Sequence, residues 1–213
     1  MTLSDEGRIG SYEILRLLGR GETAAVYECR HTSLGRLAAV KILHPHLARD
    51  RSAAKRFLRE GRTLSRIDHP NVVEVFDVGE RDNVPYLVMS LVDGDDLEEH
   101  FRQYHPMMVG HIADCMLPVV AAVAAAYDAG VVHRDVKPSN IRLAVDHRGK
   151  LVPKVLDFGI SKLTGDERGP KLTATDGMLD TVSYMSPELL RSSKHANVRS
   201  DVYSLGVILY RAA

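Results

Sequence analysis

The sequence predicts an α+β fold of two lobes: five antiparallel strands with one helix, followed by a mainly helical lobe. Most of residues 12–92 consists of short aliphatic runs separated by turn residues, a pattern typical of strands. Residues 51–67 instead repeat apolar residues at helical spacing. After Gly94 the strand pattern gives way to alanine-rich helical segments. We therefore divide the chain into a leader (1–11), a strand-rich lobe (12–92) and a helical lobe (93–213).

The strands of the first lobe are predicted from runs of strand length between glycine-bearing or polar turns. The helix at 51–67 is indicated by Phe57, Leu64 and Ile67, which recur on one face. A turn at Arg81–Asn83 separates the last two strands. The five strands are expected at residues 11–19, 24–32, 36–43, 69–79 and 84–92.

The second lobe is expected to begin with a short helix over 95–103 and a longer, mostly buried helix over 108–129. Pro118 lies inside the longer helix and is expected to interrupt it, because proline lacks an N–H donor and clashes with the preceding turn. A polar loop with a short strand (131–145) and a second short strand (151–159) follow. Residues 160–197 show little regular pattern, and a last helix begins at 199.

Composition and charge exclude several classes of protein. The 213 residues carry 28 Lys and Arg and 28 Asp and Glu, so the net charge is zero and nucleic-acid binding is not expected. The N-terminus lacks the apolar core of a secretory signal. The longest uncharged run has 13 residues, short of the ~20 that a membrane span needs. We therefore expect a cytoplasmic chain without a membrane segment.

The cysteines and histidines indicate neither a disulfide framework nor a zinc site. Cys29 and Cys115 are 86 residues apart and are expected to be free, buried thiols in a reducing compartment. Two histidine pairs lack a third ligand at a spacing typical of zinc sites: His44 with His46 and His105 with His111.

A glycine-bearing turn, Leu18-Gly19-Arg20-Gly21, joins the first two expected strands. Glycines let backbone N–H groups come close to a phosphate, but a plain hairpin turn explains the same residues. Because the turn leads into a strand rather than a helix, a dinucleotide-binding fold is disfavoured.

Lys41 and Glu60 are charged residues at positions that should be buried. Lys41 stands in an apolar strand, and Glu60 lies on the apolar face of the helix. A buried charge requires a partner, so a Lys41–Glu60 pair is one interpretation. The alternatives are an edge-strand lysine that reaches water and a glutamate neutralised by Arg56 or Arg62.

The segment 133–140 concentrates chemically capable side chains between an apolar helix and a strand, among them Asp135, Lys137 and Asn140. A second acid, Asp157, follows a strand and precedes Phe158 and a glycine. Asn140 and Asp157 offer oxygen donors, which suit Mg²⁺ rather than Zn²⁺. A surface loop can hold such charges by chance, but chance does not account for Asp157.

The order of these segments resembles that of the eukaryotic-type (Hanks-type) serine/threonine protein kinases, particularly their bacterial members. The resemblance runs from about Tyr12 to the end and implies a bilobal protein-kinase-like fold whose C-lobe is truncated. The segments, in order, are the glycine turn, the strand lysine, the helix glutamate, His133-Arg134-Asp135-Val136-Lys137-Pro138-Ser139-Asn140, Asp157-Phe158-Gly159 and Ser186-Pro187-Glu188.

The resemblance implies ATP and Mg²⁺ as cofactors and assigns the nucleotide-binding residues. Lys41 would hold the α- and β-phosphates and pair with Glu60, Met89 would be the gatekeeper behind the adenine, and Asp96 would bind the ribose. The implied ATP-binding residues are Leu18, Gly19, Arg20, Gly21, Val26, Ala39, Lys41, Glu60, Met89, Ser90, Val92 and Asp96.

The resemblance also assigns the catalytic residues Asp135, Lys137 and Lys41. Asp135 would accept the proton of the substrate hydroxyl, and Lys137 would mark Ser/Thr specificity and steady the γ-phosphate. Asn140 and Asp157 would ligate Mg²⁺. Such a set suits phosphoryl transfer, because that reaction needs positioning and charge neutralisation more than covalent chemistry.

Regulation through the activation segment after residue 157 is implied as well. Arg134 is of the kind that a phosphate on this segment neutralises. Thr173 and Thr175 are the expected phosphosites, against the alternative of a solvated loop. Asp201 would anchor the backbone of the loop around Asp135. Four residues match the regulatory stack of the family, for which plain core packing is an equal explanation: Leu64, Val75, His133 and Phe158.

The sequence departs from the family pattern at several positions. Ala24 replaces the third loop glycine, and Asp180 replaces the glycine before Thr181. Arg142 occupies an aliphatic position beneath the adenine, where its stem could pack while the guanidinium reaches water. The chain also ends before the last helices of the family's C-lobe, so that the helix at 199–213 is expected to expose an apolar face.

We therefore expect an ATP- and Mg²⁺-dependent kinase that phosphorylates Ser and Thr hydroxyls of proteins in signalling. One alternative is a catalytically impaired nucleotide-binding or docking fragment, caused by the truncated C-lobe. Another is a small-molecule phosphotransferase, which the segment Ser186-Pro187-Glu188 disfavours. The expected partners are protein substrates, without nucleic acid or a membrane segment in this chain, and a dimer for autophosphorylation is left open.

Overall fold

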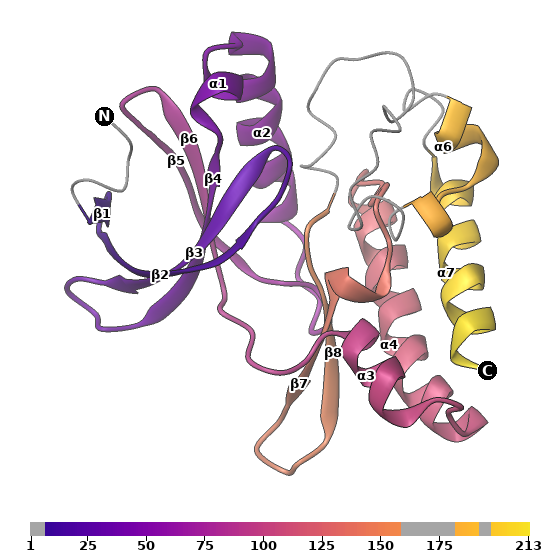
Figure 1. The fold of residues 1–213 in the computed structure, drawn as a ribbon. Coiled ribbons are helices and arrows are strands. Elements are labelled where there is room, and N and C mark those ends of the chain that lie inside the picture. Colours follow the sequence, from indigo (N-terminus) through magenta and orange to yellow (C-terminus); the bar gives the residue numbers. More distant parts are fainter. Residues whose placement is uncertain (1–6, 159–181, 192–196) are drawn as a thin grey trace. The chain divides into compact units, whose positions relative to one another are not determined.

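The computed structural model describes residues 7–158, 182–191 and 197–213. These residues form two compact units. Unit 1 comprises residues 7–66 and 74–91, and unit 2 comprises residues 67–73 and the described residues from 92 onward. Figure 1 shows a curled sheet with helices in unit 1 and a mainly helical unit 2, which confirms the predicted α+β class.

The centre of unit 1 is a six-stranded antiparallel sheet with the order β1-β2-β3-β4-β6-β5 (Figure 1). Five of its strands were predicted, and the two-residue β1 adds a sixth inside the expected leader, where Ile9 is buried. Asp82 and Asn83 have positive φ at the turn between the last two strands, a geometry that short polar residues tolerate. The strands are β1 Arg8–Ile9, β2 Tyr12–Arg20, β3 Ala24–His31, β4 Leu37–Leu43, β5 Val75–Arg81 and β6 Val84–Met89.

The two faces of this sheet bury different residues because strand side chains alternate. One face holds a core cluster that includes Ile9, Cys29, Val40 and Val88. Helix α2 (Arg51–Leu64) packs against β5 and β6, and its Gly61 lies so close to Leu87 that an added Cβ would come within 3.1 Å of that side chain. Leu87 alternates with Val88 along β6, so α2 covers the opposite face.

Helix α2 begins where its sequence provides a cap. The Asp50 side chain accepts a hydrogen bond of 2.8 Å from the Ser52 N–H, which satisfies one of the free donors at a helix start. Phe57 and Leu64 are buried, as the helical spacing predicts. A one-turn helix, α1 (Pro45–Ala48), precedes α2 and contacts it.

The predicted fourth strand starts too early. Residues 69–74 were assigned to it, but β5 begins at Val75. The segment 67–73 belongs to unit 2, where Val73 N–H donates to the Val155 carbonyl and Val155 N–H donates to the Asn71 carbonyl. The apolar run at residues 72–73 is therefore extended because it pairs with a strand of unit 2.

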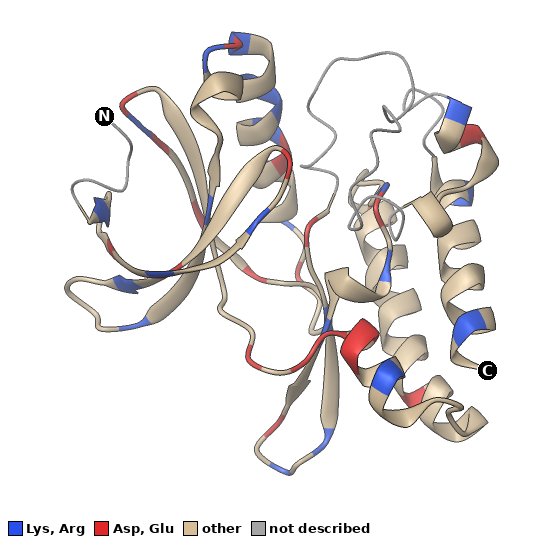
Figure 2. Ribbon diagram, viewed as in Figure 1, with Lys and Arg blue, Asp and Glu red and all other residues tan. Residues whose placement is uncertain are grey.

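Unit 2 contains four helices, a 3₁₀ turn and a two-stranded antiparallel sheet within its described residues. Helix α4 packs against β8 and α7. Figure 2 shows acidic residues at the start of α3 and a basic residue further along it, an order that favours the helix dipole. The elements are α3 Leu97–Tyr104, α4 Val109–Asp128, η2 Pro138–Asn140, β7 Ile141–Val145, β8 Leu151–Val155, α6 Pro187–Arg191 and α7 Val198–Ala212.

The expected interruption at Pro118 is wrong, since α4 continues through it. Proline removes one backbone hydrogen bond, but a buried stripe that includes Cys115, Val119 and Ala122 keeps the helix packed on both sides of Pro118. By length and composition this 20-residue helix could also cross a membrane. The core helix of a soluble protein passes the same test, so α4 alone is weak support for a membrane span.

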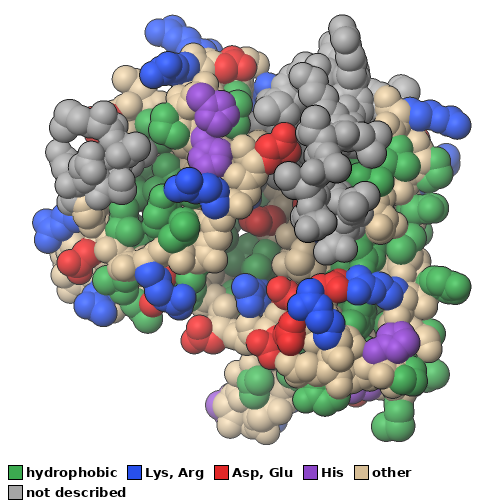
Figure 3. All heavy atoms as spheres, viewed as in Figure 1, with side chains coloured by type: hydrophobic (Ala, Val, Ile, Leu, Met, Phe, Trp, Pro, Cys, Tyr) green, Lys and Arg blue, Asp and Glu red, His purple; other side chains and the backbone are tan. Residues whose placement is uncertain are grey.

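The last described helix, α7, buries one face and exposes the other. Ser200, Asp201, Leu205 and Ile208 are buried. Figure 3 shows hydrophobic side chains at the surface along α7. The large exposed hydrophobic residues of this helix are Val202, Tyr203, Leu209 and Tyr210. The exposed apolar face that the sequence predicted for this helix is therefore present.

Candidate active site

Four of the predicted nucleotide-binding residues share one face of the unit 1 sheet. Val26 pairs with Lys41 between β3 and β4, and Ala39 pairs with Met89 between β4 and β6. Residues that pair directly across strands lie on the same face, and Ala39 and Lys41, two apart on β4, also share a face. The antiparallel register therefore gathers side chains that are far apart in sequence.

Lys41 is 4% exposed, which removes the alternative of an edge-strand lysine that reaches water. It pairs with Leu87, the residue on which Gly61 of α2 packs. Glu60 neighbours Gly61 on that helix and is half-buried. The structure thus puts Lys41 on the face that α2 covers, while the Lys41–Glu60 ion pair stays a prediction.

The predicted glycine turn is a hairpin end held by backbone bonds. Leu18, Gly19 and Arg20 are exposed at the end of β2, and Gly21 N–H donates to the Ala24 carbonyl at 2.9 Å. His44 Nε2 lies 2.9 Å from the Gly21 carbonyl. The turn is therefore anchored to the end of β4, and an added Cβ at Gly19 would meet nothing within 4 Å.

The segment after β6 carries Ser90 and Val92, whose backbone is predicted to bind adenine. Ser90 N–H donates to the Glu74 carbonyl in unit 1. In unit 2, Gly94 has φ +124° and lies so close to β7 that a Cβ would be 2.1 Å from the Leu143 carbonyl. Only glycine fits there. Leu143 N–H also donates to the Asp95 carbonyl, so this segment is fastened to β7.

Arg142 does not send its guanidinium only to water, as the sequence suggested. Its Nη1 donates to the Gly94 carbonyl at 2.8 Å, and the residue is half-buried. Arg142 therefore holds the segment before α3 against β7. Asp96 forms an isolated bridge with Arg142 and caps α3, since its Oδ1 accepts a 2.9 Å bond from Glu99 N–H.

The three predicted catalytic-loop side chains meet around the Asp135 carboxylate. Lys137 Nζ lies 3.2 Å from Asp135 Oδ2, and Asn140 Nδ2 donates to the same oxygen at 3.0 Å and to the Asp135 carbonyl at 2.8 Å. Asp135 and Lys137 keep only 11% and 19% of their side chains exposed. Because the Asn140 amide nitrogen points to Asp135, the amide oxygen is directed elsewhere and suits a cation.

The backbone of this loop is anchored by Asp201 of α7. Its two carboxylate oxygens accept 2.8 Å hydrogen bonds from His133 N–H and Arg134 N–H, which confirms the role predicted for this acid. Burial raises the pKa of Asp201, and these two N–H donors oppose that rise. Arg134 is held at φ +65°, a region that costs energy for a non-glycine residue.

The His133 ring joins the loop to the end of β8. Its Nε2 lies 2.9 Å from the Leu156 carbonyl, and its Nδ1 accepts a 3.3 Å bond from Asp135 N–H. These partners define a neutral ring with the proton on Nε2. Complete burial lowers the pKa of His133 despite the nearby acids, in agreement with that neutral state.

Asp157 directly follows Leu156, the residue of the β8 end that is hydrogen-bonded to the catalytic loop. Leu156 N–H donates to the Asn140 carbonyl at 2.8 Å, so the backbone of the loop is bonded to the residue before Asp157. Asp157 has φ +55°, and Phe158 packs on the His133 ring at 4.5 Å. Unit 2 thus brings Asp135, Asn140 and Asp157 into one hydrogen-bonded region, although 22 residues of chain separate the first from the last.

The predicted regulatory residues are only partly visible. Thr173, Thr175, Asp180 and Thr181 lie outside the described residues. Of the predicted stack, His133 and Phe158 are in contact within unit 2; Leu64 and Val75 belong to unit 1. The end of the activation segment carries helix α6, which the sequence did not predict, and its Glu188 accepts a 2.9 Å bond from Ser200 Oγ.

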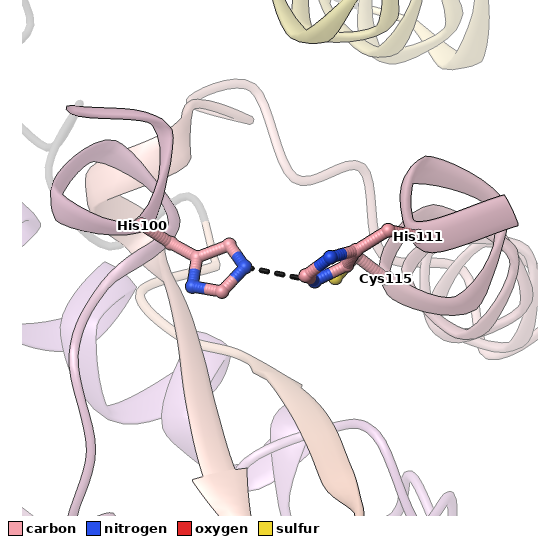
Figure 4. A group of neighbouring side chains, drawn as sticks. All are labelled: His100, His111 and Cys115. Carbon is pink, nitrogen blue, oxygen red and sulfur yellow. Dashed lines mark hydrogen bonds between the residues drawn. The ribbon is translucent and has the colours of Figure 1, made fainter. Parts of the chain in front are cut away.

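One cluster was missed by the sequence reasoning. His100 of α3 meets His111 and Cys115 of α4 (Figure 4), whereas the sequence suggested His105 as the neighbour of His111. The i, i+4 spacing of His111 and Cys115 on one helix face was the available signal. The position of His100 depends on how the two helices pack, which no local pattern shows.

Comparison with known proteins agrees with this arrangement. The family model described as the protein kinase domain matches residues 12–213. The serine/threonine-protein kinase PrkC of Bacillus subtilis is 39% identical over 201 residues, which is 94% of this chain and 30% of PrkC. The probable serine/threonine-protein kinase PknB of Lactococcus lactis is 38% identical over 93% of this chain and 31% of its own length. The chain thus spans about a third of these relatives.

A solved structure gives the same result. The crystal structure of the Mycobacterium tuberculosis PknI kinase domain superposes with a TM-score of 0.73 at 29% identity and covers 99% of this chain and 75% of that chain. The resemblance read from the motifs is therefore confirmed by sequence and by fold. The chain belongs to the protein kinase domain family.

Proposed function

We propose that this chain transfers the γ-phosphoryl group of ATP to serine and threonine hydroxyls of protein substrates. One observation carries the proposal: the Asp135 carboxylate is fixed by Lys137 Nζ and Asn140 Nδ2 on a backbone that Asp201 anchors. A general base must be oriented in advance, and this network orients Asp135. The family relationship supports the same reaction.

The residues divide the chemistry among themselves. Asp135 accepts the proton of the substrate hydroxyl. At the same time the hydroxyl oxygen bonds to the γ-phosphorus, and the bond between that phosphorus and the leaving oxygen of ADP breaks. Lys137 places an ammonium group beside Asp135, where it offsets negative charge on the transferred group. Lys41 supplies a second ammonium group for the α- and β-phosphates.

The oxygen donors fit Mg²⁺. The amide oxygen of Asn140 is directed away from Asp135, and Asp157 provides a carboxylate next to the residue bonded to Asn140. Hard oxygen ligands of this kind are what Mg²⁺ takes alongside substrate phosphates. When bound, Mg²⁺ neutralises phosphate charge. Asn140 and Asp157 are the residues that would hold it.

Regulation by phosphorylation at Thr173 or Thr175 is part of the proposal. Arg134 directly precedes Asp135 and is held in a left-handed conformation by the loop. A phosphate of about −1.5 to −2 charge can pair with such a guanidinium and order a segment. Replacing both threonines with alanine should abolish activation without changing Mg·ATP affinity.

Incubation with labelled ATP tests the proposal. Wild-type chain should incorporate phosphate, Asp135→Asn should not, and Asp128→Asn, which changes an exposed acid at the end of α4, should behave as wild type. Equal incorporation by Asp135→Asn would exclude the proposed base.

The second candidate function is a nucleotide-binding or docking fragment without transfer activity. It is favoured by the exposed hydrophobic residues of α7. Mg·ATP binding without transfer by this chain, together with transfer by a longer form that includes the remaining helices of that domain, would establish this alternative.

A further inference from the structure

The cluster of His100, His111 and Cys115 lies outside the proposed kinase machinery (Figure 4). His100 comes from α3, and the other two residues are one turn apart on α4. Their ligand atoms all lie within 4.8 Å of one another, and the two Nε2 atoms are 2.9 Å apart. Three potential ligand atoms from two helices thus lie close together.

The three residues of the cluster are largely buried, and the two histidine rings are hydrogen-bonded to each other. His100 and Cys115 are buried and His111 is half-buried. The Nε2 atom of one ring donates its proton to the Nε2 lone pair of the other, so the two Nε2 atoms face each other.

From this geometry we propose that His100, His111 and Cys115 form a Zn²⁺ site that joins α3 to α4. Zinc prefers nitrogen and sulfur ligands in tetrahedral geometry, with about 2.0–2.1 Å to nitrogen and 2.3 Å to sulfur. These lengths require about 3.3 Å between the two nitrogens and about 3.5 Å from nitrogen to sulfur. The cluster reaches such a geometry with shifts on the order of 1 Å.

Binding requires a defined exchange of protons. The Cys115 Sγ–H proton leaves to solvent, and the proton shared by the two Nε2 atoms moves to a ring Nδ1, so that two neutral imidazoles and one thiolate remain. Tyr104, next to His100 at a ring separation of 4.5 Å, is 54% exposed. His111 of the cluster is itself half-buried, so the cluster has a solvent-facing side, from which a water molecule would complete the tetrahedron.

The ligand type separates this site from the oxygen-rich kinase site. Asn140 and Asp157 offer hard oxygen atoms, whereas this cluster offers two imidazoles and a thiol. Excess Mg²⁺ should therefore fill the first without competing for the second. The zinc site and the kinase activity can fail independently of each other.

Cobalt substitution tests the zinc site. Tag-free, chelator-treated chain in excess Mg²⁺ is titrated with Co²⁺, and the thiolate-to-cobalt charge-transfer band is followed. We expect one Co²⁺ per chain with this band, and its loss when one equivalent of Zn²⁺ is added. Cys115→Ala should remove the band, and His111→Asn should weaken binding about tenfold or more.

Two matched variants serve as controls. Cys29→Ala removes the other buried thiol, in unit 1, and His105→Asn removes an exposed histidine near the same helices; both should keep the band and the affinity. Absence of the band in wild type, or a band that survives Cys115→Ala, would overturn the site. Should Cys115→Ala not fold, equal Co²⁺ affinities of His111→Asn and His105→Asn would overturn it as well.

Discussion

The two units hold their predicted functional side chains in different ways. In unit 1, Val26, Lys41 and Met89 are placed by the register of an antiparallel sheet. In unit 2, Asp135 and Asn140 lie on an irregular loop that depends on a few long-range bonds, above all those to Asp201.

This difference in how the side chains are held indicates where substitutions should cost the most stability. A sheet distributes its restraint over many backbone hydrogen bonds, so one side chain can change without moving its neighbours. The loop relies on single buried acceptors, and an unmet buried donor is costly. We therefore expect conservative substitutions to cost more stability in the unit 2 network than on the unit 1 face.

The largest effect is expected for Asp201→Ala. It leaves the His133 and Arg134 N–H groups without their acceptor in a buried place, which should lower the free energy of unfolding by about 2–6 kcal/mol. Urea unfolding measures the loss. Asp201→Asn keeps one acceptor oxygen and should lose less; equal stability of Asp201→Ala and wild type would show that the loop is held by other contacts.

The second-largest effect is expected from acid, which should lower the free energy of unfolding through His133 in the same hydrogen-bonded network. Burial lowers the pKa of His133 below its ordinary value of 6.5, so the unfolded chain takes up the proton first as the pH falls. Stability should therefore be full above about pH 6.5 and decline below it, with a slope of at most about 1.4 kcal/mol per pH unit for this group.

Urea unfolding at a series of pH values checks this prediction. Burial raises the pKa of Asp201 above its ordinary value of 3.8. As the pH falls through that raised pKa towards 3.8, protonation of Asp201 therefore favours the folded chain, which is opposite in sign to the effect of His133. His133→Asn should flatten the slope near pH 6, and an unchanged slope in that variant would assign the acid sensitivity to other groups.

Arg142→Leu should have a smaller effect. The variant loses the hydrogen bond from the guanidinium to the Gly94 carbonyl, which at this half-buried position is worth about 0.5–1.5 kcal/mol. Arg148→Leu changes an exposed arginine in the turn after β7 and should leave thermal unfolding unchanged. Identical melting of Arg142→Leu and wild type would mean that the Gly94 bond contributes nothing.

The smallest effect is expected on the unit 1 face. Met89→Leu conserves volume at a buried position and should change the unfolding free energy by less than about 1.5 kcal/mol, as measured in the same urea series. A loss as large as that of Asp201→Ala would contradict the contrast between the two units.

Much of the fold was predictable because its patterns are local. The apolar run that forms β4 and the helical spacing of Phe57 and Leu64 each depend on neighbours in sequence, and both are confirmed. The motif order was equally informative, because Asp135, Asn140 and Asp157 lie in short segments that together match a single family.

What the sequence missed depends on contacts between distant segments. Pro118 remains inside α4 because the packing of that helix compensates for one lost hydrogen bond. Arg142 binds Gly94, 48 residues away, and His100 meets His111 only through the packing of α3 on α4. The segment at 67–73 joined unit 2 for the same reason.

The central claim is that the proposed phosphoryl transfer requires both Lys41 and Asp157 for binding of Mg·ATP, and calorimetric titration with ATP tests it most directly. In the presence of Mg²⁺, Lys41→Met and Asp157→Asn should each bind ATP at least about tenfold more weakly than wild type. Without Mg²⁺ the effect of Asp157→Asn should vanish while that of Lys41→Met remains. Wild-type affinity of either variant for Mg·ATP would contradict the claim.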